Sequence, residues 1–411
     1  SLHDALPIFT EEKTTPNTLL NFKTYYKKCK HTINEKSKVE KELVNKTITF
    51  TGYFYDLYPT FREIPEGVIV TYHVFVTPII NSVEIKGNTE IEASKEIEEE
   101  KVEKLENKKD GKVDIVDINS KTRPYAVVVN NTPVAVKVQT GLNKAYLVYE
   151  FPTEGNTSRL MALYKDVNEL TIGTIRSSRH NFIDYALESN AIYVHFGWSK
   201  PAEKDQKAGS IEYLNGLFDT PFWRENPENL AVEHTAYTSL EKVASAVSKK
   251  GYKTEVSNAE DTILLKYDTD DIDLSKVENA KQANKIVIPY GSAQNTTSFV
   301  YDSENKMYNR IEDGKNCIDH KTKEQVNTKN IIVQKIEYTT GYQGTKYWDL
   351  KTTGSGDGYF ITNGYAVPIK WSKETRKAKT KYTYLDGKEI EVSDGRTYIE
   401  LQTNSQKLTI E

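Results

Sequence analysis

The chain has 411 residues, enough for two or three domains that each bury their own core, and 55 Lys and Arg against 59 Asp and Glu leave a net charge of -4 at pH 7. Without an excess of positive charge there is no field to hold nucleic acid or an anionic membrane, so we expect no nucleic-acid partner. Aromatic residues make up 11% of the chain, which argues against wholesale disorder. No apolar run reaches the ~18–20 residues of a membrane helix.

The two cysteines, Cys29 and Cys317, lie far apart in unlike contexts, so neither a disulfide framework nor a cysteine-based zinc site can be assembled from them. The chain begins at Ser1 without Met, a charged region or an apolar signal core. We expect residues 1–15 to be a disordered leader, and any export signal or lipid anchor to be missing from this chain.

Arginine is scarce and unevenly spread. Nine Arg stand beside 46 Lys, and five of the nine fall between residues 123 and 224. A guanidinium is a planar fork that suits two-point binding of carboxylates and phosphates, so an Arg retained in a lysine-rich chain is weak evidence for such a role. Sampling noise is the alternative explanation.

The first part of the chain predicts a small α+β accessory domain over residues 16–87. Apolar residues recur there every three or four positions from Leu19 to Ile33, which is typical of one face of a helix. Strands are predicted over 47–55 and 68–77, where β-branched and aromatic residues are frequent. Residues 88–121 are rich in charge and lack aromatic residues, which predicts a linker.

Residues 122–283 predict a layered α/β domain, because apolar strands alternate with helices. The predicted strands are 125–129, 145–151, 160–164 and 191–195, and the predicted helices are 178–189 and 241–250. Residues 284–405 predict a β-rich domain, either a twisted sheet or a small barrel. Its short strands are separated by Asx-Gly pairs such as Asp313-Gly314 and Asn363-Gly364, which are typical of hairpin turns.

The segment 171–180 carries the main predicted binding site. It combines Gly173, hydroxyl side chains and two arginines just before a predicted helix, and such a helix start offers backbone N–H groups and bidentate donors to an anion. The alternative is that a serine merely caps the helix while the arginines pair with Glu150, Glu154 or Asp184. The predicted ligand contacts in and near this segment are Arg176, Ser177, Arg179, Tyr193, Trp198 and Asn215.

Two histidines are candidate general bases. His195 ends a predicted strand, where α/β sheets place ligands, and His234 follows Glu233. Two distant histidines specify no metal-ligand spacing, so we predict no metal site, and hydrogen-bonded core histidines are the alternative. Neither Ser177 nor Cys317 lies in a nucleophile motif.

A second predicted ligand-binding element is the glycine-dense stretch before residue 359. Its residues Gly354, Ser355, Gly356 and Asp357 are predicted to form a loop whose backbone amides line a groove. A flexible hairpin connection is the alternative. No cofactor motif is present, and we predict no cofactor.

Several stretches resemble the YerB-like bacterial lipoprotein family. In the first half they are 123–131, 139–142, 148–150, 175–179, 193–195 and 214–216, and in the second half 309–315, 330–334, 354–359, 363–364, 368–373 and 395–398. The resemblance is collinear over about residues 120–403. It implies a domain of unknown function and an exported, lipid-anchored protein of Gram-positive bacteria. The chain departs from the family pattern at Thr132, Lys137, Thr235 and Cys317, whereas Arg176, Arg179, His195 and His234 match it.

Three functions remain open on this basis. The first is a cell-surface protein that binds an anionic or glycan-type component of the cell envelope in a cleft of the α/β domain. The second is a hydrolase or transferase acting on the cell wall, with His195 or His234 as general base. The third is a structural assembly module that uses its 27 tyrosines at interfaces. Whether the chain is an enzyme stays undecided.

Overall fold

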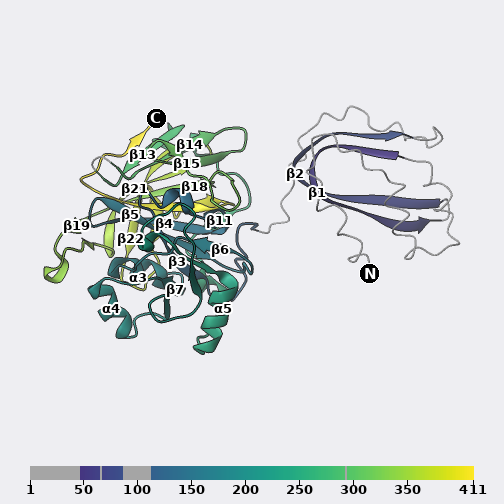
Figure 1. Ribbon diagram of the computed structural model, residues 1–411. Helices are drawn as coiled ribbons and strands as arrows, with labels where there is room; N and C mark the ends of the chain where they lie inside the picture. Colours follow the sequence, from purple (N-terminus) through teal and green to yellow (C-terminus); the bar gives the residue numbers. More distant parts are fainter. Residues whose placement is uncertain (1–46, 65–66, 87–112, 292–293) are drawn as a thin grey trace. The chain divides into compact units, whose positions relative to one another are not determined.

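The computed structural model describes residues 47–64, 67–86, 113–291 and 294–411 (Figure 1). The chain divides into two compact units, residues 1–105 and 106–411. Within the described residues, no helix has the length and apolar character needed to cross a membrane. The predicted leader, the predicted helix after residue 16 and the predicted linker up to residue 112 lie outside the described residues.

In the first unit, two long strands are described. β1 (Thr47–Ile64) and β2 (Gly67–Lys86) pair antiparallel. Both are rich in β-branched and aromatic residues, which favour extended backbone. The structure confirms the strands predicted over 47–55 and 68–77 and extends both.

An 11-stranded sheet runs through the second unit. Its strands are β3 (Tyr125–Asn130), β4 (Leu147–Thr153), β5 (Thr157–Tyr164), β7 (Ile192–His195), β8 (Tyr213–Asn215), β12 (Lys281–Gln282), β18 (Asn330–Ile336), β21 (Gly354–Thr362), β22 (Tyr365–Lys373), β23 (Lys381–Tyr384) and β25 (Thr397–Thr403). Their order is β12-β22-β21-β18-β25-β4-β5-β3-β7-β8, with β23 beside β22. Because β25 pairs in parallel with β4, one sheet joins the two predicted domains, and the predicted boundary at 283/284 does not separate two compact units.

A six-stranded sheet contains β13 (Lys285–Pro289), β14 (Thr296–Asp302), β15 (Met307–Glu312), β16 (Lys315–Asn316), β17 (Asn327–Thr328) and β26 (Thr409–Ile410). Smaller sheets pair β6 (Thr171–Gly173), β9 (Phe222–Arg224) and β10 (Ala236–Ser239), then β11 (Lys266–Asp268) with β24 (Glu391–Ser393), and β19 (Tyr338–Thr339) with β20 (Asp349–Leu350). The second half is β-rich, as predicted. Its described strands form open sheets, so of the two predicted alternatives, a twisted sheet and a small barrel, the barrel is wrong.

Three α-helices occur among the described residues of this unit: α3 (His180–Leu187), α4 (Lys200–Lys207) and α5 (Leu240–Lys249). The Ser199 hydroxyl caps α4 by accepting from the Ala202 N–H, and Ser239 caps α5 in the same way. α3 and α5 confirm the predicted helices within two residues at each end, whereas α4 was not predicted. Short 3-10 turns complete the unit: η2 (Val136–Val138), η3 (Leu142–Lys144), η4 (Val232–His234), η5 (Ala259–Thr262), η6 (Leu274–Lys276) and η7 (Tyr342–Gly344).

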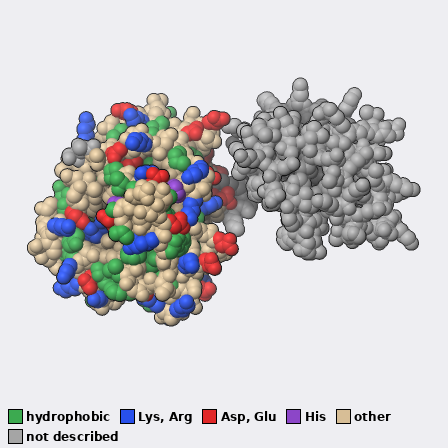
Figure 2. All heavy atoms as spheres, in the orientation of Figure 1, with side chains coloured by type: hydrophobic (Ala, Val, Ile, Leu, Met, Phe, Trp, Pro, Cys, Tyr) green, Lys and Arg blue, Asp and Glu red, His purple; other side chains and the backbone are tan. Residues whose placement is uncertain are grey.

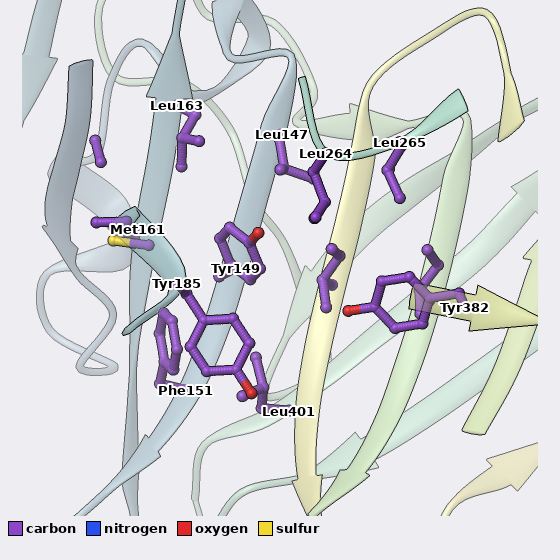
Figure 3. Packing of buried hydrophobic residues seen from close by; sticks show 14 of the residues in the cluster. Leu147, Tyr149, Phe151, Met161, Leu163, Tyr185, Leu264, Leu265, Tyr382 and Leu401 are labelled. Atoms are coloured by element: carbon purple, nitrogen blue, oxygen red, sulfur yellow. The ribbon is translucent and has the colours of Figure 1, made fainter. Parts of the chain in front are cut away.

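Both faces of the large sheet are buried. Along β3, Ala126 and Val128 join one apolar cluster while Val127 and Val129 join the other, which explains the uninterrupted apolar run in the sequence. The first cluster includes residues of α3 and α4, and Tyr149, Phe151 and Tyr185 lie together there (Figure 3). The second cluster includes α5 and the six-stranded sheet.

The last predicted linker residues belong to the folded unit. Val113 and Val116 are buried in the first apolar cluster, and the Asp394 carboxylate accepts the backbone N–H of Ile115 at 3.0 Å. The predicted linker over 88–121 therefore extends too far, because these valines pack rather than remain in solvent. On the face shown in Figure 2, acidic and basic side chains are interspersed over the second unit.

Candidate functional site

The backbone of residues 175–178 lies against the end of β3 and the segment after β7. The Arg176 N–H donates to Val128 O (2.9 Å), and Arg176 O accepts from the Phe196 N–H (3.0 Å). α3 begins directly afterwards, but no side chain caps it, so the alternative that a serine caps this helix is wrong. Residues 175–178 are thus an ordered, extended segment that leads directly into α3.

Arg179 is neutralised by an acidic neighbour. Its guanidinium forms an ion pair through two nitrogens with the Glu154 carboxylate, and its side chain is only 10% exposed. Arg159 lies nearby and donates to Ser177 O at 2.6 Å. Arg179 and Arg159 each lower the pKa of Glu154, and together they keep it below its usual range despite burial. The position of Arg179 therefore agrees better with the alternative, in which it pairs with Glu154, than with the predicted role in binding an anion.

Arg176 and His234 lie on the same side of the sheet. Arg176 Nη1 donates to the backbone oxygen of Glu233 at 3.0 Å. His234 Nδ1 lies 2.8 Å from the amide nitrogen of Asn130, which ends β3. Both residues are half-buried, so this part of the predicted site is open to solvent.

His195 is enclosed in the protein and does not have the role predicted for it. Its side chain is fully buried, Nδ1 donates to Gly197 O (2.8 Å), and Nε2 is hydrogen bonded to the Gln206 side-chain amide (2.7 Å). Burial lowers the pKa of His195 to about 4. The prediction of His195 as a general base is wrong, because no substrate reaches either ring nitrogen.

Other predicted contacts are also structural. Tyr193 is fully buried and donates through its hydroxyl to Ser178 Oγ (3.0 Å). Asn215 is fully buried and accepts the backbone N–H groups of Gly197 and Leu217. Trp198 is half-buried and lies edge-on to Tyr213 (5.7 Å). Tyr193 and Asn215 cannot contact a ligand, since both are covered by protein.

The predicted glycine-dense loop is part of a strand. Gly354, Ser355, Gly356 and Asp357 open β21 and pair with β22. Gly356 is required by close packing, because a Cβ there would lie 2.6 Å from Trp371 Nε1. Asp357 forms an exposed ion pair with Lys370. The amides of this stretch serve the sheet ladder, so the prediction of a ligand-lining loop is wrong.

A polar pocket of about 710 Å³ lies beside the end of the predicted segment. α3 supplies His180, Asn181 and Asp184, and α4 supplies Lys204 and Asp205. The stretch 337–353 and Arg376 complete the lining. Its volume lies in the range of small-molecule sites.

Hydrogen bonds fix the walls of this pocket to one another. The Asn181 amide donates to Trp348 O (2.8 Å) and accepts from the Leu350 N–H (3.2 Å). The Thr352 hydroxyl donates to Asp184 Oδ2 at 2.6 Å. α3 is therefore tied to the stretch that contains β20, and the pocket is preformed.

Arg376 joins two carboxylates of the pocket. Its Nε lies 2.6 Å from Asp184 Oδ1, and its Nη2 lies 2.5 Å from Asp205 Oδ2. Burial raises the pKa of Asp184, while the Thr352 hydroxyl and Arg376 oppose that rise. These two carboxylates raise the pKa of Arg376, so the guanidinium stays charged.

Aromatic rings line the same pocket. The Tyr342 ring stacks on His180, with centroids 4.1 Å apart and planes 17° from parallel. Tyr338 lies against Trp348 at 4.5 Å. His180 Nε2 is 3.3 Å from the Asp349 carboxylate, yet burial lowers the pKa of His180. The pocket thus combines half-exposed rings with hydrogen-bonding groups.

The sequence predictions missed most of this pocket. Asp184 was not predicted as a ligand contact, and Tyr342 and Arg376 were not singled out. A signal was present, because residues 338–348 contain three tyrosines, a tryptophan and two glycines. No cluster of three or more potential metal ligands occurs among the residues that the structure describes.

Comparison with known proteins places this chain in a family. The model "Protein of unknown function (DUF3048) N-terminal domain" matches residues 112–253, and the corresponding C-terminal domain matches residues 286–399. The chain belongs to this family, the one that its sequence motifs resemble.

One relative is the "Putative lipoprotein YerB" of Bacillus subtilis (strain 168). It is 32% identical over 287 residues, covering 68% of this chain and 81% of the relative. The crystal structure of YerB from Bacillus subtilis superimposes with a TM-score of 0.60 at 27% identity and covers 72% of this chain and 99% of that one. The family resemblance predicted from the sequence is confirmed.

Proposed function

We propose that this chain is a bacterial cell-surface protein that binds a glycan of the cell envelope in the pocket between α3, α4 and residues 337–353. The relative named a putative lipoprotein supports the location. The stacked pair of Tyr342 and His180, beside the carboxylates that Arg376 joins, is the observation that carries the choice of ligand.

The chemistry of a sugar matches these groups. A pyranose ring has a face of C–H groups that packs on an aromatic ring, and a rim of hydroxyls that donate to carboxylates and accept from N–H groups. Tyr342 offers the first contact, and Asp205, Arg376 and Lys204 offer the second. Such a preformed pocket binds without paying for the ordering of its walls.

The charges of the pocket favour a glycan without acidic groups over an anionic ligand. Four acidic residues, Asp184, Asp205, Glu337 and Asp349, face three basic ones, Lys204, Lys351 and Arg376. Lys351 is paired with Glu337 at 3.0 Å, and Arg376 is shared by two aspartates. No excess of positive charge is left there for an anion.

Binding is better supported than hydrolysis. Glycosidases need one protonated and one ionised carboxyl group on either side of the scissile bond. Asp184 and Asp205 instead accept hydrogen bonds from the same guanidinium, so they are held together on one cation rather than placed on either side of a scissile bond. His195, one of the two predicted general bases, is buried, so it cannot act as the base of a hydrolase.

The test is binding of the purified chain to isolated neutral glycan strands, oligomers of N-acetylglucosamine without an acidic group, compared with Tyr342→Ala. We expect the variant to bind about tenfold more weakly, because it loses the stacking surface. Tyr359→Ala is the matched control, since Tyr359 is also half-buried and contacts a charged side chain, Lys281, outside the pocket.

We expect Tyr359→Ala to bind like the unmodified chain, and the glycan strands to be recovered uncleaved. Absence of binding by the unmodified chain, or equal binding by Tyr342→Ala, would overturn the proposal. Cleavage of the strands would show that the chain is a hydrolase rather than a binding protein.

A further inference from the structure

A second polar site lies at the end of β3, away from the residues that line the glycan pocket. Arg176 donates to Glu233 O with Nη1, and its Nε is buried without a partner among the described residues. Its Nη2 has no hydrogen bond in the described part of the chain either. Arg376, by contrast, has a carboxylate partner for each of its three guanidinium nitrogens.

The orientation of His234 adds a second donor. The Asn130 amide donates to His234 Nδ1 at 2.8 Å, so this nitrogen carries no proton in the neutral ring. The proton then resides on Nε2, which has no hydrogen-bond partner among the described residues. Thr132 Oγ1 lies 3.5 Å from the same ring.

The local charge balance is positive. Three guanidinium groups gather around this segment, those of Arg159, Arg176 and Arg179. Arg179 and Arg176 lower the pKa of Arg159, and Arg179 also lowers the pKa of Arg176. Glu154 is the carboxylate that pairs with Arg179. Glu233 is exposed, and it is in contact with Arg176 through its backbone oxygen rather than its carboxylate.

We propose that Arg176 and His234 form a binding site for an oxyanion group, a phosphate or a carboxylate, with Thr132 at its edge. The guanidinium supplies the charge and a free Nη2 donor, and the imidazole supplies Nε2–H. Asn130 is a positioning residue, because its amide sets which ring nitrogen carries the proton. This site goes beyond the glycan proposal and does not depend on it.

The experiment is an NMR titration of the full chain with inorganic phosphate and, separately, with acetate. The His234 ring resonance is followed and is assigned by its loss in His234→Gln. We expect a saturable shift with a Kd in about the millimolar range for at least one anion. The anion that binds more tightly shows whether the site prefers a phosphate or a carboxylate. Arg176→Ala should weaken binding by about tenfold or more, and Arg176→Lys by less, since Lys keeps the charge but not the fork.

Lys381→Ala removes an exposed cation of β23 and is the control, which should bind like the unmodified chain. Arg176→Lys guards against a folding defect in Arg176→Ala. No saturable shift with either anion, or equal affinity in the unmodified chain, Arg176→Ala and Arg176→Lys, overturns the site. Because Tyr342→Ala leaves Arg176 in place, we expect it to retain phosphate or acetate binding even if glycan binding fails.

Discussion

Arg310 and Arg376 are each surrounded by carboxylates, and the two clusters differ in their access to solvent. The Arg310 side chain is 0% exposed and lies 3.0 Å from both Glu150 and Glu312, which are 0% and 2% exposed. The Arg376 side chain is 48% exposed, and its partners Asp184 and Asp205 line a pocket. A guanidinium between two carboxylates is therefore closed off from solvent in one region and partly open to solvent in the other.

The buried cluster lies where the two large sheets meet. Glu150 on β4 and Glu400 on β25 are register neighbours in the 11-stranded sheet, and Arg310 and Glu312 lie on β15 of the six-stranded sheet. Glu150 also accepts hydrogen bonds from Asn131, Ser158 and Thr297. Each charge there depends on its partners, since no water can replace a lost one.

Removing Arg310 should give the largest effect. Arg310→Met leaves buried carboxylates without their cation, and we expect the free energy of unfolding to fall by about 3–5 kcal/mol. Urea unfolding followed by circular dichroism measures this change. A loss below about 1 kcal/mol would contradict the expected difference between the buried Arg310 and the more exposed Arg376.

The buried cluster should also make stability depend on pH. Burial raises the pKa of Glu312 from 4.5 to about 7, so the folded state binds a proton that the unfolded state releases above about pH 4.5. The contribution of Glu312 to stability is therefore greatest below pH 4.5 and falls as pH rises towards 7. Replacing Glu312 with Gln removes this titration, so we expect the variant to gain about 1–3 kcal/mol relative to the unmodified chain between pH 5 and pH 8. A difference that stays constant across pH would rule this out.

Removing the exposed arginine should cost less stability. Arg376→Met breaks ion pairs that water can partly replace, and we expect a loss of about 1 kcal/mol in urea unfolding. Glycan binding should weaken more clearly, because Arg376 orients two carboxylates of the pocket. If the free energy of unfolding fell as far as in Arg310→Met, Arg376 would have a structural role like that of Arg310.

The smallest effect is expected at Asp357. Asp357→Asn breaks an exposed ion pair with Lys370, and we expect a change within about 0.5 kcal/mol and unchanged glycan binding. Thermal unfolding and the glycan-strand assay check both. Weakened binding would restore the predicted role of the stretch 354–357 as a ligand contact.

The sequence pattern was enough to predict most local structure. The apolar run of β3 and the periodicity of α3 and α5 are local signals, and the Asn363-Gly364 turn has the positive φ angles of 48° and 79° that such a pair predicts. The family resemblance was also evident from short motifs. The pairing of β4 with β25 was not predictable in this way, since its partners lie 250 residues apart.

The candidate site was predicted only in part. Segment 171–180 leads to the pocket through His180, and Arg176 and His234, both candidate site residues of the sequence, are half-buried and lie near each other. His195, Tyr193 and Asn215 have the composition of a site but are buried, because a polar side chain at a strand end can bond to backbone as well as to a ligand. Arg376 reaches Asp184 only through tertiary contact, which no local pattern encodes.

The parallel pairing of β4 with β25 has a consequence for the order of folding. A chain that ends at residue 283 lacks β25 and β18, so β4 would present an unpaired edge in the middle of the sheet. Contacts over such separations form late, because loop closure costs entropy before the pairing compensates for it. The central sheet can therefore be completed only after the strand ending at Thr403 has been synthesised. We expect the two halves of this chain to fold as one cooperative body rather than as successive modules.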